Sequence, residues 1–104
     1  MNSGRVEAAL REYEAALRLE PRDAKAWFNR GTALGKLRRW DEARASYLQA
    51  IERRPGYAEA RFNLALLALT LGDRDVAAAQ HRALQAIDPG AAARLAALLS
   101  SRGR

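Results

Sequence analysis

Cysteine is absent from this chain of 104 residues, and histidine occurs only once. The missing cysteines exclude disulfides, thiolate nucleophiles and zinc sites with sulfur ligands. The single histidine excludes metal sites that are built from several imidazoles. Prolines and aromatic residues are few as well, three and seven in number. The composition therefore excludes thiol catalysis and most metal sites, and we expect no metal and no cofactor.

Long apolar stretches are also missing. No run of about 18 apolar residues occurs, which is the length that a membrane-spanning helix needs. Arg5 and Glu7 lie close to the amino terminus, so the apolar core of a signal peptide is missing too. We therefore expect a soluble, cytoplasmic protein that makes no membrane contact. The length itself suits one compact domain, for which ~100 to 200 residues are usual.

The residues that are abundant favour helix. The chain has 24 alanines and 15 leucines, and few β-branched residues. The formal net charge is +6, and 16 of the 18 cationic residues are arginine. Arginine suits the recognition of carboxylates or phosphates, but a coding bias towards arginine and alanine gives the same composition. The predicted fold class is all-α.

The three prolines mark an internal repeat. Pro21, Pro55 and Pro89 are 34 residues apart, and recurrence at a fixed period indicates a repeat architecture. Several other residue types recur in the same register: Ala9, Ala43 and Ala77; Tyr13, Tyr47 and His81; Phe28 and Phe62; Asn29 and Asn63. Because these matches occur together, chance is a poor explanation for them.

Apolar residues at helical spacing divide each full period into two helices. In the middle period we expect Asp41 to cap the second helix, which must end before Pro55. Gly31, Ala43 and Ala50 are small enough to let two helices approach closely. The helices predicted in this way cover residues 4–20, 24–37, 41–54, 59–71, 76–87 and 91–101.

This pattern resembles the tetratricopeptide repeat, whose signature is W-x2-L-G-x2-Y, then A-x3-F, then P. The middle period supplies these positions with Trp27, Arg30, Gly31, Leu34, Ala43, Tyr47 and Pro55. It departs from the signature at Arg30, where the family has leucine, and at Leu34, where it has tyrosine. The third period keeps Ala65, Ala77 and Pro89. The resemblance covers residues 4 to 91 approximately.

The resemblance implies a right-handed α-solenoid of antiparallel helical hairpins, with about two and a half repeats. We expect a single domain over residues 1–104. Its predicted parts are a half repeat that contributes only its second helix (4–21), two full repeats (24–57 and 58–91) and a closing helix (91–101).

Members of this family are scaffolds for protein interactions, and the first helix of each repeat lines a concave groove. By that resemblance, the residues expected to bind a partner are Lys25, Phe28, Asn29, Thr32, Lys36, Glu59, Phe62, Asn63, Leu66 and Thr70. At least one of Phe28 and Phe62 is expected to line the groove; the alternative is that both pack between helices. One subgroup of the family clamps a terminal carboxylate with lysine, asparagine and arginine, but only Asn29 fits that pattern here.

Other functions find less support. No nucleophile, base and orienting group occur together, so we expect no catalytic residue and no enzyme. His81 stands where the other periods have tyrosine, which predicts a half-buried packing residue. Nucleic acid is disfavoured as a partner, because Arg38 and Arg39 lie about 20 Å from Arg53 and Arg54 by helix rise, with acidic residues interspersed.

The interpretation is therefore a non-enzymatic protein-interaction module whose groove binds a peptide or helix of a partner protein. The alternative is a self-assembly module that forms head-to-tail homo-oligomers. It follows from the incomplete first repeat, whose helix would expose Val6, Leu10, Tyr13 and Leu17 unless another molecule's closing helix covered them.

Overall fold

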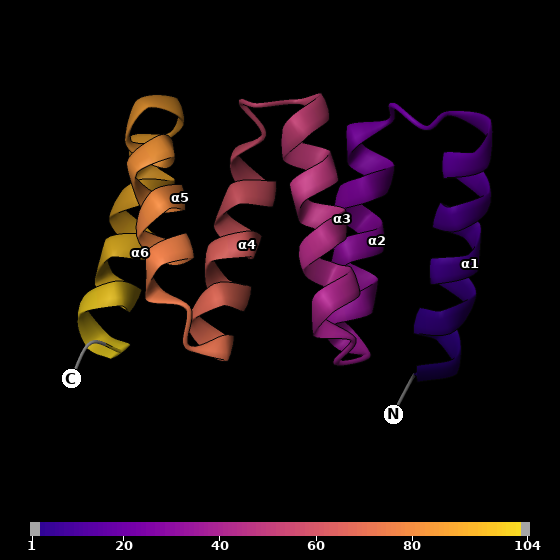
Figure 1. Ribbon diagram of the computed structural model, residues 1–104, viewed down its shortest axis with the longest axis horizontal. Helices are drawn as coiled ribbons and strands as arrows, with labels where there is room; N and C mark the ends of the chain where they lie inside the picture. The colour runs from indigo at the N-terminus through magenta and orange to yellow at the C-terminus, as the bar shows by residue number, and fades with distance from the viewer. Residues whose placement is uncertain (1–2, 103–104) are drawn as a thin grey trace. The chain divides into compact units, whose positions relative to one another are not determined.

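The computed structural model describes residues 3–102, which form α-helices and no β-strand (Figure 1). The helices are α1 (Ser3–Leu19), α2 (Ala24–Lys36), α3 (Trp40–Arg53), α4 (Ala58–Leu71), α5 (Arg74–Ile87) and α6 (Pro89–Arg102). The prediction of an all-α fold is confirmed.

The chain divides into two compact units, Met1–Pro55 and Gly56–Arg104. The first unit holds α1 to α3 and the second holds α4 to α6. The single domain expected over residues 1–104 stays a prediction, and residues 1–2 and 103–104 of it lie outside the described part of the chain.

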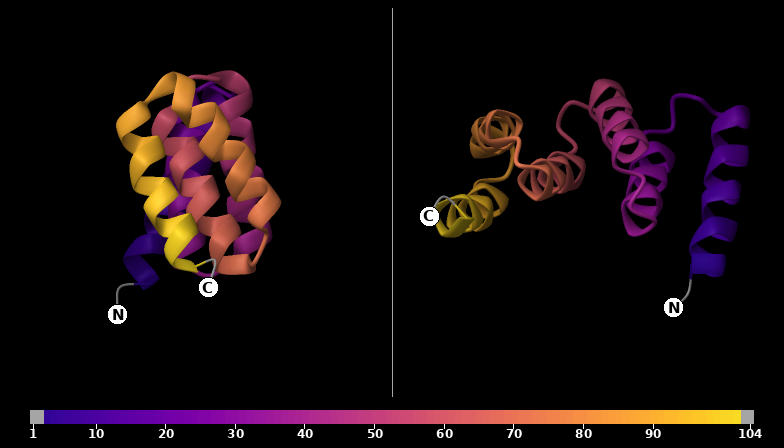
Figure 2. Two further views of the ribbon diagram at one scale, coloured as in Figure 1. Left: turned by 90° about the vertical axis from the view of Figure 1, so that its left-hand side faces the viewer. Right: turned by 60° about the horizontal axis from the view of Figure 1, so that its bottom comes forward.

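In the first unit, α2 packs against both α1 and α3, and the right-hand view of Figure 2 shows α2 lying between these two helices. The expectation that α1 exposes Leu10 and Leu17 is wrong. Their side chains are only 4% and 8% exposed, because α2 covers the face of α1 that carries them. Val6 and Tyr13 on the same helix are half-buried.

The close approach expected at Gly31 lies between α2 and α3. A Cβ atom placed on Gly31 would be 2.9 Å from the ring of Tyr47 and 3.2 Å from the backbone oxygen of Ala43. Glycine therefore allows the two helices to pack at this distance, with the Tyr47 ring lying against the backbone of α2.

In the second unit, α4, α5 and α6 all contact one another. Their shared core consists of alanine and leucine side chains: Ala65, Ala68, Leu69, Ala77, Leu84, Ala91, Ala92 and Leu95. The last three of these come from α6, so the final helix completes this core.

Short polar side chains begin several of the helices. The carboxylates of Asp23, Asp73 and Asp88 accept hydrogen bonds from backbone N–H groups in the first turns of α2, α5 and α6. The bond to Asp88 helps α6 to begin at Pro89, two residues earlier than expected, because proline is tolerated in a first helical turn.

The cap predicted at Asp41 is wrong. Helix α3 begins one residue earlier, at Trp40, and the preceding residue, Arg39, makes no side-chain cap hydrogen bond. Asp41 lies instead in the first turn, where a negative charge interacts favourably with the helix dipole.

Candidate functional site

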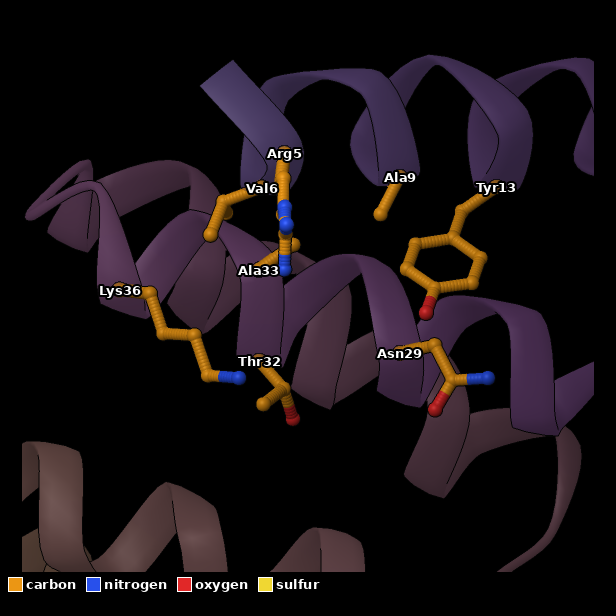
Figure 3. Close-up of a pocket in the computed structure, with 8 residues that line it drawn as sticks. All are labelled: Arg5, Val6, Ala9, Tyr13, Asn29, Thr32, Ala33 and Lys36. Atoms are coloured by element: carbon orange, nitrogen blue, oxygen red, sulfur yellow. The ribbon is translucent and has the colours of Figure 1, made fainter. Parts of the chain in front are cut away.

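A cleft of about 250 Å³ opens between α1 and α2 in the first unit. Its lining residues are Arg5, Val6, Ala9 and Tyr13 from α1, and Asn29, Thr32, Ala33 and Lys36 from α2. Figure 3 shows the α1 side chains pointing toward α2, with the hydroxyl of Tyr13 directed at Asn29 and the amine of Lys36 directed at Thr32. The cleft is therefore lined by two cationic side chains, three neutral polar side chains and three small apolar side chains.

Three of the residues predicted for the groove line this cleft, namely Asn29, Thr32 and Lys36. Lys25, also predicted, is exposed near the amino end of α2 but does not line it. Phe28 is half-buried, with its ring centroid 5.9 Å from that of Tyr47 at a tilted angle. The side chain of Phe28 thus has a packing partner within its own unit.

The hydroxyl of Thr32 makes two hydrogen bonds within the protein. It donates to the backbone oxygen of Phe28 across 3.2 Å, and its oxygen lies 3.1 Å from the hydroxyl of Tyr47. Since the only proton of Thr32 serves Phe28, Tyr47 is the donor in the second bond. Thr32 therefore shapes the cleft and holds Tyr47, with one acceptor site left for a ligand.

The predicted residues of the second unit lie along α4. Glu59 and Thr70 are exposed, whereas Asn63 and Leu66 are half-buried. Phe62 packs against the core shared by α4, α5 and α6, and the guanidinium of Arg94 lies 5.5 Å from its ring centroid. Helix α6 therefore covers part of the aromatic surface that was expected to face a partner.

The contribution of α1 to the cleft is absent from the sequence prediction. Arg5, Val6, Ala9 and Tyr13 line it, although none of them was among the predicted groove residues; Val6 and Tyr13 were named only in the self-assembly alternative. The signal that could have found two of them is the 34-residue register, which aligns Ala9 and Tyr13 with Ala43 and Tyr47. Arg5 has no such signal, and the place of Arg5 and Val6 in the cleft depends on how α1 packs on α2.

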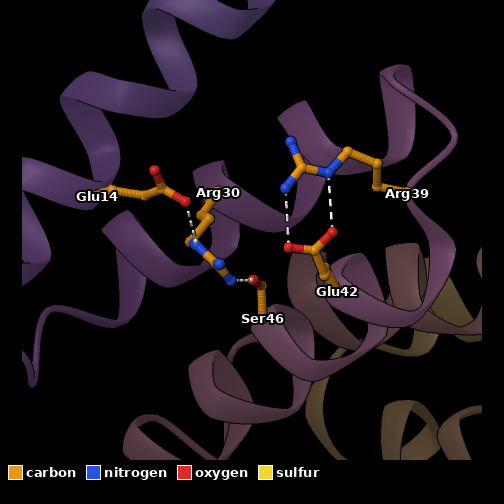
Figure 4. A network of polar contacts seen from close by, with 5 residues as sticks. All are labelled: Glu14, Arg30, Arg39, Glu42 and Ser46. Atoms are coloured by element: carbon orange, nitrogen blue, oxygen red, sulfur yellow. Dashed lines mark hydrogen bonds and ion pairs between the residues drawn. The ribbon is translucent and has the colours of Figure 1, made fainter.

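A bidentate ion pair stands at the start of α3. Arg39 donates from Nε and Nη2 to the two carboxylate oxygens of Glu42, across 2.8 and 2.9 Å (Figure 4). This hydrogen-bonded pair lowers the pKa of Glu42 and raises the pKa of Arg39 from their ordinary values. Both side chains are exposed, so water screens the pair.

His81 is half-buried, as predicted. It lines a separate cavity of about 450 Å³ in the second unit, between α5 and α6. The other lining residues are Gln85, Pro89, Ala92, Ala93 and Ala96. None of these lining residues is a nucleophile or carries a charge.

Comparison with known families identifies the fold. The tetratricopeptide repeat model matches residues 29–92, and a second model described as TPR repeat matches residues 1–37. The chain belongs to the tetratricopeptide repeat family. Departures from its signature, such as Arg30, therefore stand within a true repeat.

One curated relative and two solved structures are similar to this chain. The peroxisomal targeting signal receptor of Saccharomyces cerevisiae is 35% identical over 60 residues, which cover 58% of this chain and 10% of the receptor. A thermophilic TPR protein of Thermus thermophilus is 35% identical, with a TM-score of 0.82 over 92% of this chain and 50% of its own.

The third is the type III secretion chaperone SycD of Yersinia enterocolitica, solved with a peptide of the translocator YopD. It has a TM-score of 0.86 over 98% of this chain and 82% of its own, at 18% identity, which shows a shared fold. This chain spans about a tenth of the length of the peroxisomal receptors that it matches.

No helix within residues 3–102 is long and apolar enough to cross a membrane.

Proposed function

We propose that this TPR protein is a non-enzymatic interaction module that binds a peptide or a helix of a partner protein through α2 of the first unit, and that α4 of the second unit offers a binding face of its own. The observation that carries the proposal is the cleft beside α2, where Asn29, Thr32 and Lys36 meet polar and apolar side chains of α1. The names of one relative and of one structure with the same fold support it: the relative is a targeting signal receptor, and the structure was solved with a bound peptide.

The chemistry of the two helix faces suits a peptide. The side-chain amides of Asn29 and Asn63 each offer donors and an acceptor to a peptide backbone. Phe28, Phe62 and Leu66 are half-buried, and their remaining apolar surface would take an apolar anchor. The exposed amines of Lys25 and Lys36 favour an acidic or mixed-charge segment, while Glu59 and Thr70 border the α4 face.

A peptide-display selection tests this proposal. Short random peptides are selected on the whole protein, and their dissociation constants are measured by calorimetry. We expect Asn29→Ala and Asn63→Ala each to weaken binding about fivefold, since a neutral hydrogen bond is worth about 1 kcal/mol. Glu52→Ala, an exposed residue on α3, is the matched control and should leave binding unchanged.

Two results would reject the proposal. The first is a selection that enriches no peptide above an unrelated protein of similar charge. The second is equal weakening by the control and by both asparagine variants, which would indicate adhesion without a defined site. Self-association stays the alternative, and it stays a prediction that nucleic acid is not a partner and that the protein lies in the cytoplasm.

A further inference from the structure

One wall of the cleft between α1 and α2 has a counterpart elsewhere in the repeat. Its α1 wall carries Ala9 and Tyr13, which correspond to Ala43 and Tyr47 of α3 in the 34-residue register. On α3, Ala43 and Tyr47 are buried beneath α2, which meets them with Gly31. On α1, the same two positions are half-buried and face the cleft. The α1 wall thus repeats a surface that receives a helix elsewhere in this molecule.

The charge of the cleft is uniform. Arg5 and Lys36 are both exposed, and none of the described side chains that line the cleft is acidic. Figure 3 shows both cations at the end of the cleft formed by the start of α1 and the end of α2. A group that enters at this end therefore meets two positive charges without a neutralising carboxylate.

The repeat also gives the direction of an incoming helix. Helix α2 leads through a short turn into α3, so the carboxyl end of α2 lies beside the amino end of α3. A helix seated on α1 in the same way places its carboxyl end beside Arg5. Cations at that end also interact favourably with the partial negative charge of a helix carboxyl terminus.

The chain's own last helix is a poor occupant. In the same register, Gly31 of α2 corresponds to Leu99 of α6. Even a Cβ atom at that position comes within 2.9 Å of the Tyr47 ring on α3, so a leucine over Tyr13 would force the helices apart. Leu99 already packs against the core of its own unit. Residues 89–102 also contain two arginines and no acidic residue, which sets like charges against Arg5 and Lys36.

We propose that this cleft is the docking site of an amphipathic helix from a partner protein. The helix has a glycine or alanine over Ala9 and Tyr13, and acidic residues in its last turn, beside Arg5 and Lys36. This inference rests on the proposed function and specifies the partner that it would recognise. The cleft has a volume of about 250 Å³. The docked helix would therefore lie across the mouth of the cleft and place only one or two of its side chains inside.

A designed peptide probes the site directly. It has the sequence of residues 24–36 with Gly35→Glu and Lys36→Glu, and a lactam bridge holds it helical, since isolated helices of this length are marginal in water. The first comparison peptide keeps Gly35 and Lys36. The second carries both glutamates and also Gly31→Leu. Fluorescence anisotropy measures the binding of each labelled peptide to the whole protein.

We expect only the glutamate peptide with Gly31 to bind well. Arg5→Glu combined with Lys36→Glu in the protein should weaken it about tenfold or more, because two attractions become repulsions. Arg11→Glu combined with Arg82→Glu reverses the same amount of charge at exposed positions outside the cleft. This matched variant should change the affinity by less than about threefold, because its charges lie outside the cleft and act on the peptide only through screened long-range electrostatics.

Three results would overturn the inference: no binding of the probe, equal binding of the three peptides, or equal weakening by the two double variants. These failures can be distinguished from failure of the proposed function. If selected peptides bind and respond to Asn63→Ala but not to charge reversal at Arg5 and Lys36, the interaction module stands without the acidic helix. If neither selected peptides nor the probe bind, both proposals fail.

Discussion

The guanidinium of Arg30 on α2 donates a hydrogen bond from Nη1 to Oγ of Ser46 on α3 across 2.6 Å (Figure 4). Ser46 is fully buried. The same guanidinium donates from Nε to the carboxylate of Glu14 on α1 across 3.3 Å. One arginine thus links the three helices of its unit from a position where the family signature has leucine.

Replacing this arginine by the family residue should therefore destabilise the protein. Arg30→Leu removes the bond to a buried hydroxyl and the pair with Glu14, and we expect the free energy of unfolding to fall by about 1–2 kcal/mol. Adding Ser46→Ala should recover part of that loss, because the hydroxyl is then gone. Urea denaturation of the two single variants and the double variant measures the coupling. Strictly additive effects would contradict a direct bond.

Two glycines of α2 should respond differently to alanine. At Gly35 a Cβ atom meets nothing within 4 Å, whereas at Gly31 it meets the Tyr47 ring. Gly35→Ala should raise stability by up to about 1 kcal/mol through helix propensity. Gly31→Ala should be less stable than Gly35→Ala by about 1–3 kcal/mol, the usual cost of overpacking. Thermal unfolding of the two variants checks this difference, and equal melting temperatures would show that Tyr47 moves aside freely.

The turns after α2 and α4 make a second matched pair. Arg38 has a φ of 60° and Gly72 has a φ of 81°, and the two residues are equivalent in the repeat. A residue with a Cβ atom is about 1–2 kcal/mol less stable in this left-handed region than a glycine, so Arg38→Gly should stabilise the protein. Gly72→Ala should destabilise it by about 1 kcal/mol for the same reason. Opposite signs in chemical denaturation are the expected result, and two changes of the same sign would contradict it.

The pair of Arg39 and Glu42 predicts a small dependence on pH. Its hydrogen bond lowers the pKa of Glu42 in the folded state, so the stabilisation is present above the unfolded pKa and is lost as pH falls through the folded value. Carbon-detected NMR should show the Glu42 carboxyl titrating below its ordinary midpoint. In Arg39→Ala that midpoint should rise, and an unchanged midpoint would assign the shift to another cause.

Much of this architecture is predictable from the chain itself. The spacing of Pro21, Pro55 and Pro89 predicts the repeat, and the periodicity of apolar residues predicts the helices to within a few residues. Such features depend on local propensity and on periodicity, which neighbouring residues share. The errors arose where a cap position or a neighbouring helix decides the outcome, as at Asp41 and Leu10.

The candidate site was only partly predictable. Asn29, Thr32 and Lys36 follow from the resemblance to a known family, and the structure brings them together with α1. The part played by Arg5 and Val6 depends on the packing of two helices, to which one helix alone gives no guide. The covering of Phe62 by Arg94 likewise joins residues 32 positions apart, a relation that local patterns do not contain.

Sequence alone thus determined the fold class, the repeat length and the family of this protein, because helix propensity and the 34-residue register are properties of the order of residues in the chain. Tertiary structure decided which surfaces remain available. Packing of α2 on α1 buried Leu10 and Leu17 but left Ala9 and Tyr13 beside an open, cationic cleft. A side chain's exposure depends on the helix that lies over it, and that helix is fixed only when the chain has folded.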